Sequence, residues 1–116
     1  MLVELLSPED KLASAKAARA ISRVARAHPT NQEAIASAGG IKIIVDLLRD
    51  TSKSKPGAAA HVEKELASAL WSMAADNSDN QAAIAEVGGI PLLIALLQGS
   101  PEVHGDAAGA LSLIHI

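Results

Sequence analysis

The sequence predicts an all-α fold in which repeated helical units stack on one another. The main observation is an internal repeat: residues 31–48 (NQEAIASAGGIKIIVDLL) and residues 80–97 (NQAAIAEVGGIPLLIALL) match without a gap. The composition agrees, because 49% of the 116 residues are apolar but only 1% are aromatic, unlike the core of most β-sandwiches. A helical unit of this kind buries its apolar face only against a neighbouring unit, so the repeat itself implies a stack.

The repeating unit has about 41 residues, because residues 62–70 (VEKELASAL) align with residues 103–111 (VHGDAAGAL). The segments upstream align at a larger offset. The first complete copy therefore carries about eight extra residues, which we expect to form an inserted surface loop near residues 51–59 (TSKSKPGAA). We expect a partial repeat at 1–30, a repeat with the insert at 31–79, and a repeat truncated in its third helix at 80–116.

Each complete unit is predicted to contain three helices, of which the first is short, at residues 31–38 and 80–87. The candidate N-caps of this helix are Thr30 or Asn31 in one copy and Asp79 or Asn80 in the other. A glycine pair follows in each copy, at residues 39–40 and 88–89. Glycine reaches the left-handed conformation that ends a helix without a Cβ clash, so we expect a sharp turn there.

The second helix is strongly apolar, and its residues repeat at the i, i+3, i+6, i+7 spacing of a buried stripe. The stripe comprises Ile41, Ile44, Leu47 and Leu48 in one copy and Ile90, Leu93, Leu96 and Leu97 in the other. The third helix is longer and is expected near residues 9–27, 59–76 and 102–116. A Ser-Pro-Glu triplet at residues 7–9 and again at 100–102 predicts two of its starts, with a capping Ser and Pro in the first turn.

The pattern that recurs is NQ-x-AI-x-x-x-GGI-x-x-(I/L)-(V/I)-x-LL, followed by an (A/S)-x-AL core in the third helix. It resembles the armadillo repeat family over nearly the whole chain, and the short first helix with its Gly-Gly turn distinguishes it from HEAT units. The resemblance implies a right-handed α-solenoid of about two and a half armadillo repeats. It also implies that the third helices line a concave groove.

Both ends of the sequence suggest a fragment of a longer solenoid. Terminal units of solenoids normally carry polar caps, whereas Leu2, Leu5 and Leu6 open this chain as a truncated second helix. At the other end the family would continue AL-x-N-L-A, but residues 111–116 read LSLIHI, which matches a translated transposon end used in sequencing libraries. We expect these residues to be non-native read-through; the alternative is an ordinary divergent helix end.

The sequence contains no constellation typical of catalysis. The four histidines lack metal-ligand spacing, and neither a G-x-S-x-G elbow nor a glycine-rich phosphate motif is present. There is no cysteine, the 10 basic and 13 acidic residues leave a net charge of −3, and no apolar run reaches the roughly 20 residues of a membrane span. We therefore expect no enzymatic activity, no cofactor or metal, no nucleic-acid partner and no direct membrane insertion.

The third helices offer candidate binding residues. Importin-like members of the resembled family use a Trp followed four residues later by an Asn, but the matching positions here are Arg19 and Arg23, Ser68 and Ser72, and Gly109 and Leu113. Instead, the spacing of Lys16, Arg19, Arg23 and Arg26 places four positive charges on one helical face. We expect this stripe to face the groove and to bind an acidic or phosphorylated segment; the alternative is the solvated face of an amphipathic helix.

The other candidate groove residues are Ser68, Ser72 and the single aromatic residue, Trp71. Trp71 flanks Leu70 and Met73, which are predicted core residues, so we interpret it as a partly buried packing residue at the junction with the next unit. The alternative is an anchor at the edge of the groove, since Trp is enriched among binding hot spots. The two roles are compatible.

The sequence therefore favours a non-enzymatic scaffold or adaptor of the cytoplasm or nucleus that binds a protein or peptide in a concave groove. Two alternatives stay open. Repeats resembling these occur in ubiquitin ligases, where they select the substrate while a separate domain recruits the conjugating enzyme. The apolar second helices and uncapped ends also suggest homotypic assembly, in which the chain self-associates.

Overall fold

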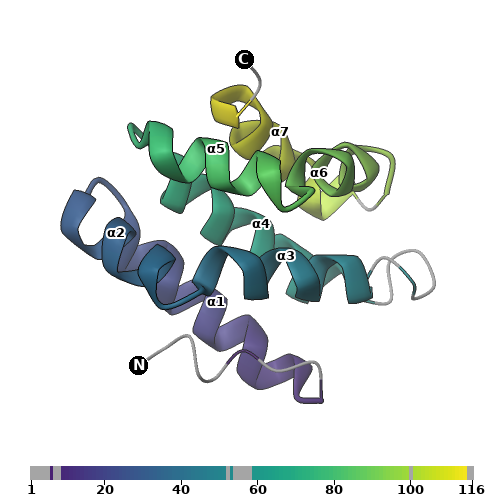
Figure 1. Ribbon diagram of the computed structural model, residues 1–116. Coiled ribbons are helices and arrows are strands. Elements are labelled where there is room, and N and C mark those ends of the chain that lie inside the picture. The colour runs from purple at the N-terminus through teal and green to yellow at the C-terminus, as the bar shows by residue number, and fades with distance from the viewer. Residues whose placement is uncertain (1–5, 7–8, 52, 54–58, 100, 115–116) are drawn as a thin grey trace.

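The computed structural model describes residue 6 and residues 9–51, 53, 59–99 and 101–114 (Figure 1). The described residues are helical apart from short connections, and none of them lies in a strand. The helices are α1 (Lys11–Ala25), α2 (Pro29–Ser37), α3 (Gly40–Thr51), α4 (Ala60–Ala74), α5 (Ser78–Glu86), α6 (Gly89–Leu97) and α7 (Pro101–Ile114). The predicted all-α class is confirmed.

The three long helices α1, α4 and α7 form one layer, in which α4 packs against both of the others (Figure 1). The shorter pairs α2–α3 and α5–α6 lie beside this layer and connect its helices. A short, a second and a long third helix recur in order as α2–α3–α4 and as α5–α6–α7, while α1 is the third helix of a further unit. The chain is thus an α-solenoid of about two and a half repeats, as the sequence predicts.

The short helices begin two residues earlier than predicted, because their N-caps are other residues. His28 caps α2 through Nδ1, which accepts a hydrogen bond from the N–H of Asn31 at 3.4 Å. Asn77 holds the equivalent position before α5, and its Oδ1 accepts from the N–H of Asn80 at 3.0 Å. The predicted caps Thr30, Asn31, Asp79 and Asn80 are therefore wrong, since all four lie inside the first turn.

Asn31 and Asn80 instead cap the ends of the preceding third helices. Asn31 Nδ2 donates to the carbonyl of Val24 at 2.7 Å, and Asn80 Nδ2 donates to the carbonyl of Met73 at 2.9 Å. The last four carbonyls of a helix have no partner inside the helix, so these two bonds provide a donor for carbonyl groups that the helix itself leaves without one. The repeated Asn thus fixes the angle between each third helix and the short helix that follows.

Gln32, the next residue of the repeated Asn-Gln pair, ties the short helix of its unit to the end of the third helix of the same unit. It is buried in α2, and its Nε2 donates to the carbonyl of Ser72 at 2.9 Å and to that of Ala75 at 3.0 Å, both at the end of α4. Asn77 Nδ2 completes the amide by donating to Gln32 Oε1 at 3.1 Å. Each such bond stabilises the fold by about 1 kcal/mol, and more is lost when one buried partner is removed.

The glycine pairs form the predicted left-handed turn, with a φ of +86° at Gly39 and +88° at Gly88. The second glycine of the later pair is required for a different reason. A Cβ at Gly89 would lie 2.6 Å from Cγ2 of Ile84 and 2.9 Å from its carbonyl oxygen. The pair therefore turns the chain and then lets α6 start directly against α5.

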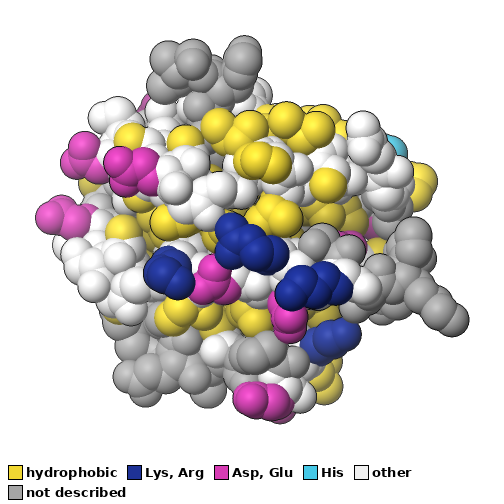
Figure 2. Space-filling model, turned by 45° about the vertical axis from the view of Figure 1, so that its right-hand side comes forward, with side chains coloured by type: hydrophobic (Ala, Val, Ile, Leu, Met, Phe, Trp, Pro, Cys, Tyr) yellow, Lys and Arg dark blue, Asp and Glu magenta, His cyan; other side chains and the backbone are white. Residues whose placement is uncertain are grey.

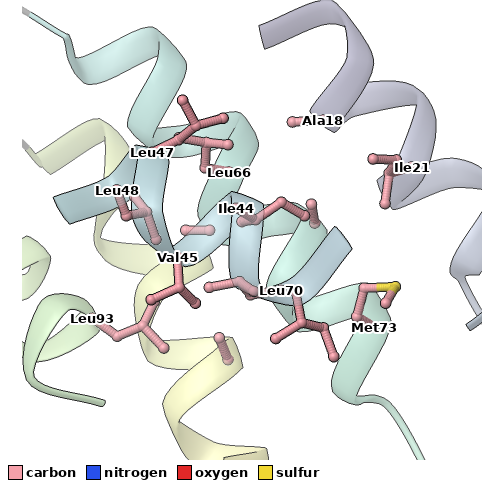
Figure 3. Packing of buried hydrophobic residues seen from close by; sticks show 14 of the residues in the cluster. Ala18, Ile21, Ile44, Val45, Leu47, Leu48, Leu66, Leu70, Met73 and Leu93 are labelled. Atoms are coloured by element: carbon pink, nitrogen blue, oxygen red, sulfur yellow. The ribbon is translucent and has the colours of Figure 1, made fainter. Parts of the chain in front are cut away.

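The core lies between the third helices and the second helices, and Figure 3 shows its centre. Leu47 of α3 points toward Leu66 of α4, while Val45 faces Leu93 of α6 (Figure 3). Several of the buried residues of α1 are small, namely Ala15, Ala18, Ser22 and Ala25. Aliphatic and small side chains thus fill a core that has no buried aromatic ring among the described residues.

The buried stripe of the second helix is confirmed in α3 and only partly in α6. Leu93 and Leu96 are buried like their equivalents, but Leu97 is 37% exposed whereas Leu48 is 1% exposed. Another pair of equivalent residues shows the same difference, since Ile94 of α6 is 46% exposed and Val45 of α3 is fully buried. The reason is the stacking itself: α5 and α6 contact α3, and no further unit contacts α6 within the described residues.

The structure defines the two ends of the predicted insert and the starts of the long helices. Thr51 ends α3 and is buried, Ala59 is buried before α4, and the rest of the insert except Lys53 lies outside the described residues. Thr51 contacts Glu63, whose pKa is raised because burial desolvates the carboxylate. The N-cap of α1 is Asp10, and α7 begins at Pro101; the predicted caps Ser7 and Ser100 lie outside the described residues.

The two short-helix caps predict a reciprocal pair of variants. His28→Asn should raise the free energy of unfolding by about 0.5–1 kcal/mol, because Asn is a preferred N-cap and the present bond is long. Asn77→His should lower it by about 1 kcal/mol or more, because the bond to Gln32 is also lost. Urea denaturation at neutral pH measures both changes. A loss of stability in His28→Asn would contradict the assignment of His28 as a replaceable cap.

Candidate binding surface between α1 and α4

The predicted basic stripe lies along the exposed side of α1. Lys16, Arg19, Arg23 and Arg26 are all exposed. Lys16, Arg19 and Arg23 line one shallow hollow of about 440 Å³ together with Ala20 and Val24. The four charges therefore share one side of the helix, as their spacing predicts.

A second hollow lies between α1 and α4 and is called here the basic groove. Its volume is about 450 Å³, and α1 contributes Arg19, Ser22, Arg23 and Arg26 to its lining. From α4 come His61, Lys64, Glu65 and Ser68, which lie on one face of that helix. The sequence analysis missed His61 and Lys64, although their i, i+3 spacing ahead of the expected groove residue Ser68 was a signal for them.

Ser68 and Ser72 hold α1 and α4 together at the floor of this surface. The hydroxyl of the buried Ser22 lies 3.0 Å from that of Ser68 and 3.1 Å from that of Ser72. These are hydrogen bonds between small side chains, so the two helices approach closely at this level. Ser68 also lines the basic groove, while Ser72 is buried and lines a neighbouring hollow.

One carboxylate faces the cations of the basic groove. Glu65 is only 9% exposed, yet it lines the groove with Arg19, Arg23, Arg26 and Lys64. Lys64 itself also lies 3.9 Å from Asp106 of α7. Four cationic side chains and one largely buried carboxylate therefore line the same groove, which keeps an excess of positive charge.

Trp71 lies at the end of the basic groove, where it lines a hollow of about 350 Å³ with Arg26, Ser72 and Ala75. Its side chain is held against α7, because a Cβ at Gly109 would lie 2.6 Å from both Cδ2 and Cε2 of the indole. Even so, Trp71 is 42% exposed. The structure thus places it at the junction with the next unit and also at the edge of a hollow, which combines the two interpretations from the sequence.

The described residues contain no group of three or more His, Cys, Asp or Glu side chains that could hold a metal ion. His28 caps α2, and His104 Nε2 lies 3.1 Å from the carbonyl of Gly99. No single described helix is long and apolar enough to cross a membrane. The pair α5–α6 reaches that length and composition only with a bend of 84°.

Comparisons with known proteins agree with this architecture. A family profile described as Armadillo/beta-catenin-like repeat matches residues 77–114, which run from the cap of α5 to the end of α7. Among solved structures, an engineered protein superposes with a TM-score of 0.84 at 31% identity, and a designed armadillo repeat protein with a TM-score of 0.81 at 27% identity. The chain has the armadillo-repeat fold.

These armadillo repeats align with only part of each solved structure. The alignments cover 97% and 98% of this chain but 43% of the engineered protein and 45% of the designed one, so the chain spans less than half of their length. A second engineered protein matches with a TM-score of 0.82 at 30% identity, and 26% of its length is covered. A search of curated proteins finds no match. Armadillo repeats in general form protein-binding scaffolds, so the basic groove is a candidate surface for binding a protein.

A second exposed surface lies on α6. Hydrophobic side chains gather over this helix in the upper half of Figure 2, above a band of charged side chains. Ile94 and Leu97 belong to this apolar surface, whereas the equivalent Val45 and Leu48 of α3 are covered by the next repeat. The surface therefore has the chemistry of an interface between repeats.

The contact of Trp71 with Gly109 predicts opposite effects for two similar substitutions in α7. Gly109→Ala should lower the free energy of unfolding by about 1–3 kcal/mol, because its methyl group would overlap the indole. Gly105→Ala is the matched control: no atom lies within 4 Å of its Cβ, so it should raise stability by about 0.5–1 kcal/mol. Trp71 is the only Trp, and its fluorescence should change in Gly109→Ala alone. Equal stabilisation by both substitutions would contradict the packing described here.

Proposed function

We propose that these armadillo repeats act as a non-enzymatic scaffold that binds an extended protein segment carrying negative charge, acidic or phosphorylated, along the basic groove. One observation carries the proposal: Arg19, Arg23 and Arg26 of α1 line the same groove as Lys64 of α4. Neighbouring repeats thus contribute cations to one surface.

The chemistry of the groove supports an anionic partner. Arginine guanidinium groups form forked hydrogen bonds to carboxylates and phosphates, and several of them along a groove suit a segment with repeated negative charges. The whole chain has a net charge of −3, so the charge of this surface is opposite in sign to that of the protein as a whole. A local excess of opposite sign steers an acidic partner to the groove and orients it there.

Charge reversal at the centre of the stripe tests this proposal. The probe is a short fluorescein-labelled peptide of alternating Glu and Ser, and its affinity is measured by fluorescence anisotropy at an ionic strength of about 0.1 M. Arg19→Glu with Arg23→Glu should weaken binding by about tenfold or more, because attraction becomes repulsion at two groove positions. Both residues are exposed, so the fold should tolerate the change.

The matched control reverses two exposed lysines elsewhere, Lys42→Glu with Lys53→Glu, which changes the net charge by the same amount. It should alter the affinity by less than about threefold, because charges beyond a Debye length of about 10 Å are screened. Absence of binding by the unmodified chain, or an equal loss in both double variants, would reject the groove as the site.

We also propose homotypic assembly through the apolar surface of α6, with a second copy of this chain as the partner. The observation that favours it is the internal comparison. Val45 and Leu48 of α3, which are equivalent to Ile94 and Leu97, are covered by the following repeat of the same sequence type. Exposed apolar patches of this kind mark interaction surfaces.

Sedimentation equilibrium over a range of about 5–500 μM tests the assembly, because self-association raises the average mass with concentration. Leu97→Glu should abolish the rise by placing a charge in the contact. Leu12→Glu is the control, since Leu12 is 62% exposed and its equivalent in α4, His61, also stays exposed. A constant monomer mass, or an equal effect of both variants, would contradict assembly through α6.

A further inference from the structure

The basic groove and the hollow beside Trp71 share a wall. Arg26 lines both of them, and the remaining lining of the second hollow is Trp71, Ser72 and Ala75. One hollow is therefore rich in charge, while the other offers an indole and a small apolar side chain. A segment that crosses Arg26 would meet both surfaces in succession.

Trp71 is suited to bind because it is already fixed. Its ring lies on the backbone of α7 at Gly109, and 42% of it is still exposed. A ring that is held in place loses little conformational freedom when a ligand packs on it, which is a general route to affinity. Most large apolar side chains that only fill the core are buried, so this exposed surface is not needed for packing.

The distance between the two hollows sets a spacing in the ligand. Lys64 and Trp71 are seven residues apart on α4, which corresponds to a rise of about 10 Å at 1.5 Å per residue. An extended chain advances by about 3.3–3.6 Å per residue, so roughly three residues cover this distance. The two side chains that enter the hollows are therefore expected about three positions apart.

The anion that fits the basic groove best is a phosphate monoester. It carries a charge of about −1.5 to −2 at neutral pH and has three strongly accepting oxygens, more than a single carboxylate offers. Arg19, Arg23, Arg26 and Lys64 together provide donors for several of these oxygens. The buried Glu65 opposes any anion there, and more strongly a dianion, so a ligand has to overcome its repulsion.

We infer that the surface recognises a phosphorylated Ser or Thr in the basic groove together with a leucine-sized apolar residue, about three positions away, on the exposed face of Trp71. Arg26 lines both subsites, and Glu65 limits the strength of anion binding by repelling the phosphate. This inference rests on the proposed function and narrows its ligand to a phosphosegment with a defined apolar partner residue.

Synthetic peptides test the inference without changing the protein. The reference peptide contains phosphoserine followed by two serines and a leucine in a Gly-Ser background. Its affinity is measured by isothermal titration calorimetry, and Trp71 emission is recorded in parallel. Replacing the leucine by serine should weaken binding by about fivefold and remove the emission change. Moving the leucine next to the phosphoserine should have the same effect, because it then cannot reach the indole.

Two further arms separate this inference from the proposed function. A peptide with Glu in place of phosphoserine should bind several-fold more weakly; equal affinity would show that a carboxylate is the ligand and overturn the phosphate assignment. If both leucine-substituted peptides bind like the reference and Trp71 emission stays constant, two-site recognition is wrong although groove binding stands. If no peptide binds, both proposals fail.

A protein variant tests the role of Glu65 in the opposite direction. Glu65→Gln keeps the shape of the buried side chain and removes its charge, so affinity for the phosphopeptide should increase by about threefold or more. Circular dichroism checks that the helices are retained. An unchanged or lower affinity with the fold intact would overturn the inferred repulsion between Glu65 and the ligand.

Discussion

The close approach of α1 and α7 to α4 is the constraint on which the rest of this structure depends. It is possible because the contacting residues are small: Ala18, Ser22 and Ala25 on α1, and Gly109 where α7 meets Trp71. Paired hydroxyls of Ser22, Ser68 and Ser72 replace bulky packing at the floor between α1 and α4. Larger side chains here would push the helices apart and separate the cations of α1 from those of α4.

Polar ties then fix the angles at which the helices leave this layer. The carbonyls of Ser72 and Ala75 accept from Gln32, that of Met73 from Asn80, and that of Ala74 from Gln81 at 3.0 Å. Side chains of two different units thus bind the carbonyls of four successive residues at the end of α4. Because Asn80 and Gln81 belong to the following repeat, the end of α4 also serves as part of the interface between repeats.

Much of this architecture could be predicted from the sequence, because repetition and periodicity directly encode stacked helices. The left-handed Gly39 and Gly88 and the buried Ile44 and Leu93 follow from backbone sterics and helical spacing alone. The capping roles could not be predicted in the same way. Asn31 has the chemistry of an N-cap, but it acts on α1, and only the three-dimensional turn places its amide near the carbonyl of Val24.

The candidate site shows the same division. The spacing of Arg19, Arg23 and Arg26 predicted a shared helical face, but the contribution of α4 depends on its rotation relative to α1. Likewise, the spacing gave no reason to place Glu65 among these cations. The burial of this carboxylate depends on tertiary structure, because α1 covers the side of α4 that carries Glu65. The equivalent residue of α1, Lys16, is exposed.

Comparison of the repeats also distinguishes positions that stabilise the fold in each unit from groove positions whose residues differ between units. Asn31 and Asn80 are identical and make the same bond, and Ile44 and Leu93 are equally buried, so these positions serve the fold in both units. In contrast, one groove position is Arg19 in α1, Ser68 in α4 and Gly109 in α7, with a different contact in each. The side chain at this position therefore differs from one third helix to the next, although the helices themselves repeat. Under the proposed function, ligand preference would reside in the positions that the repeats do not share.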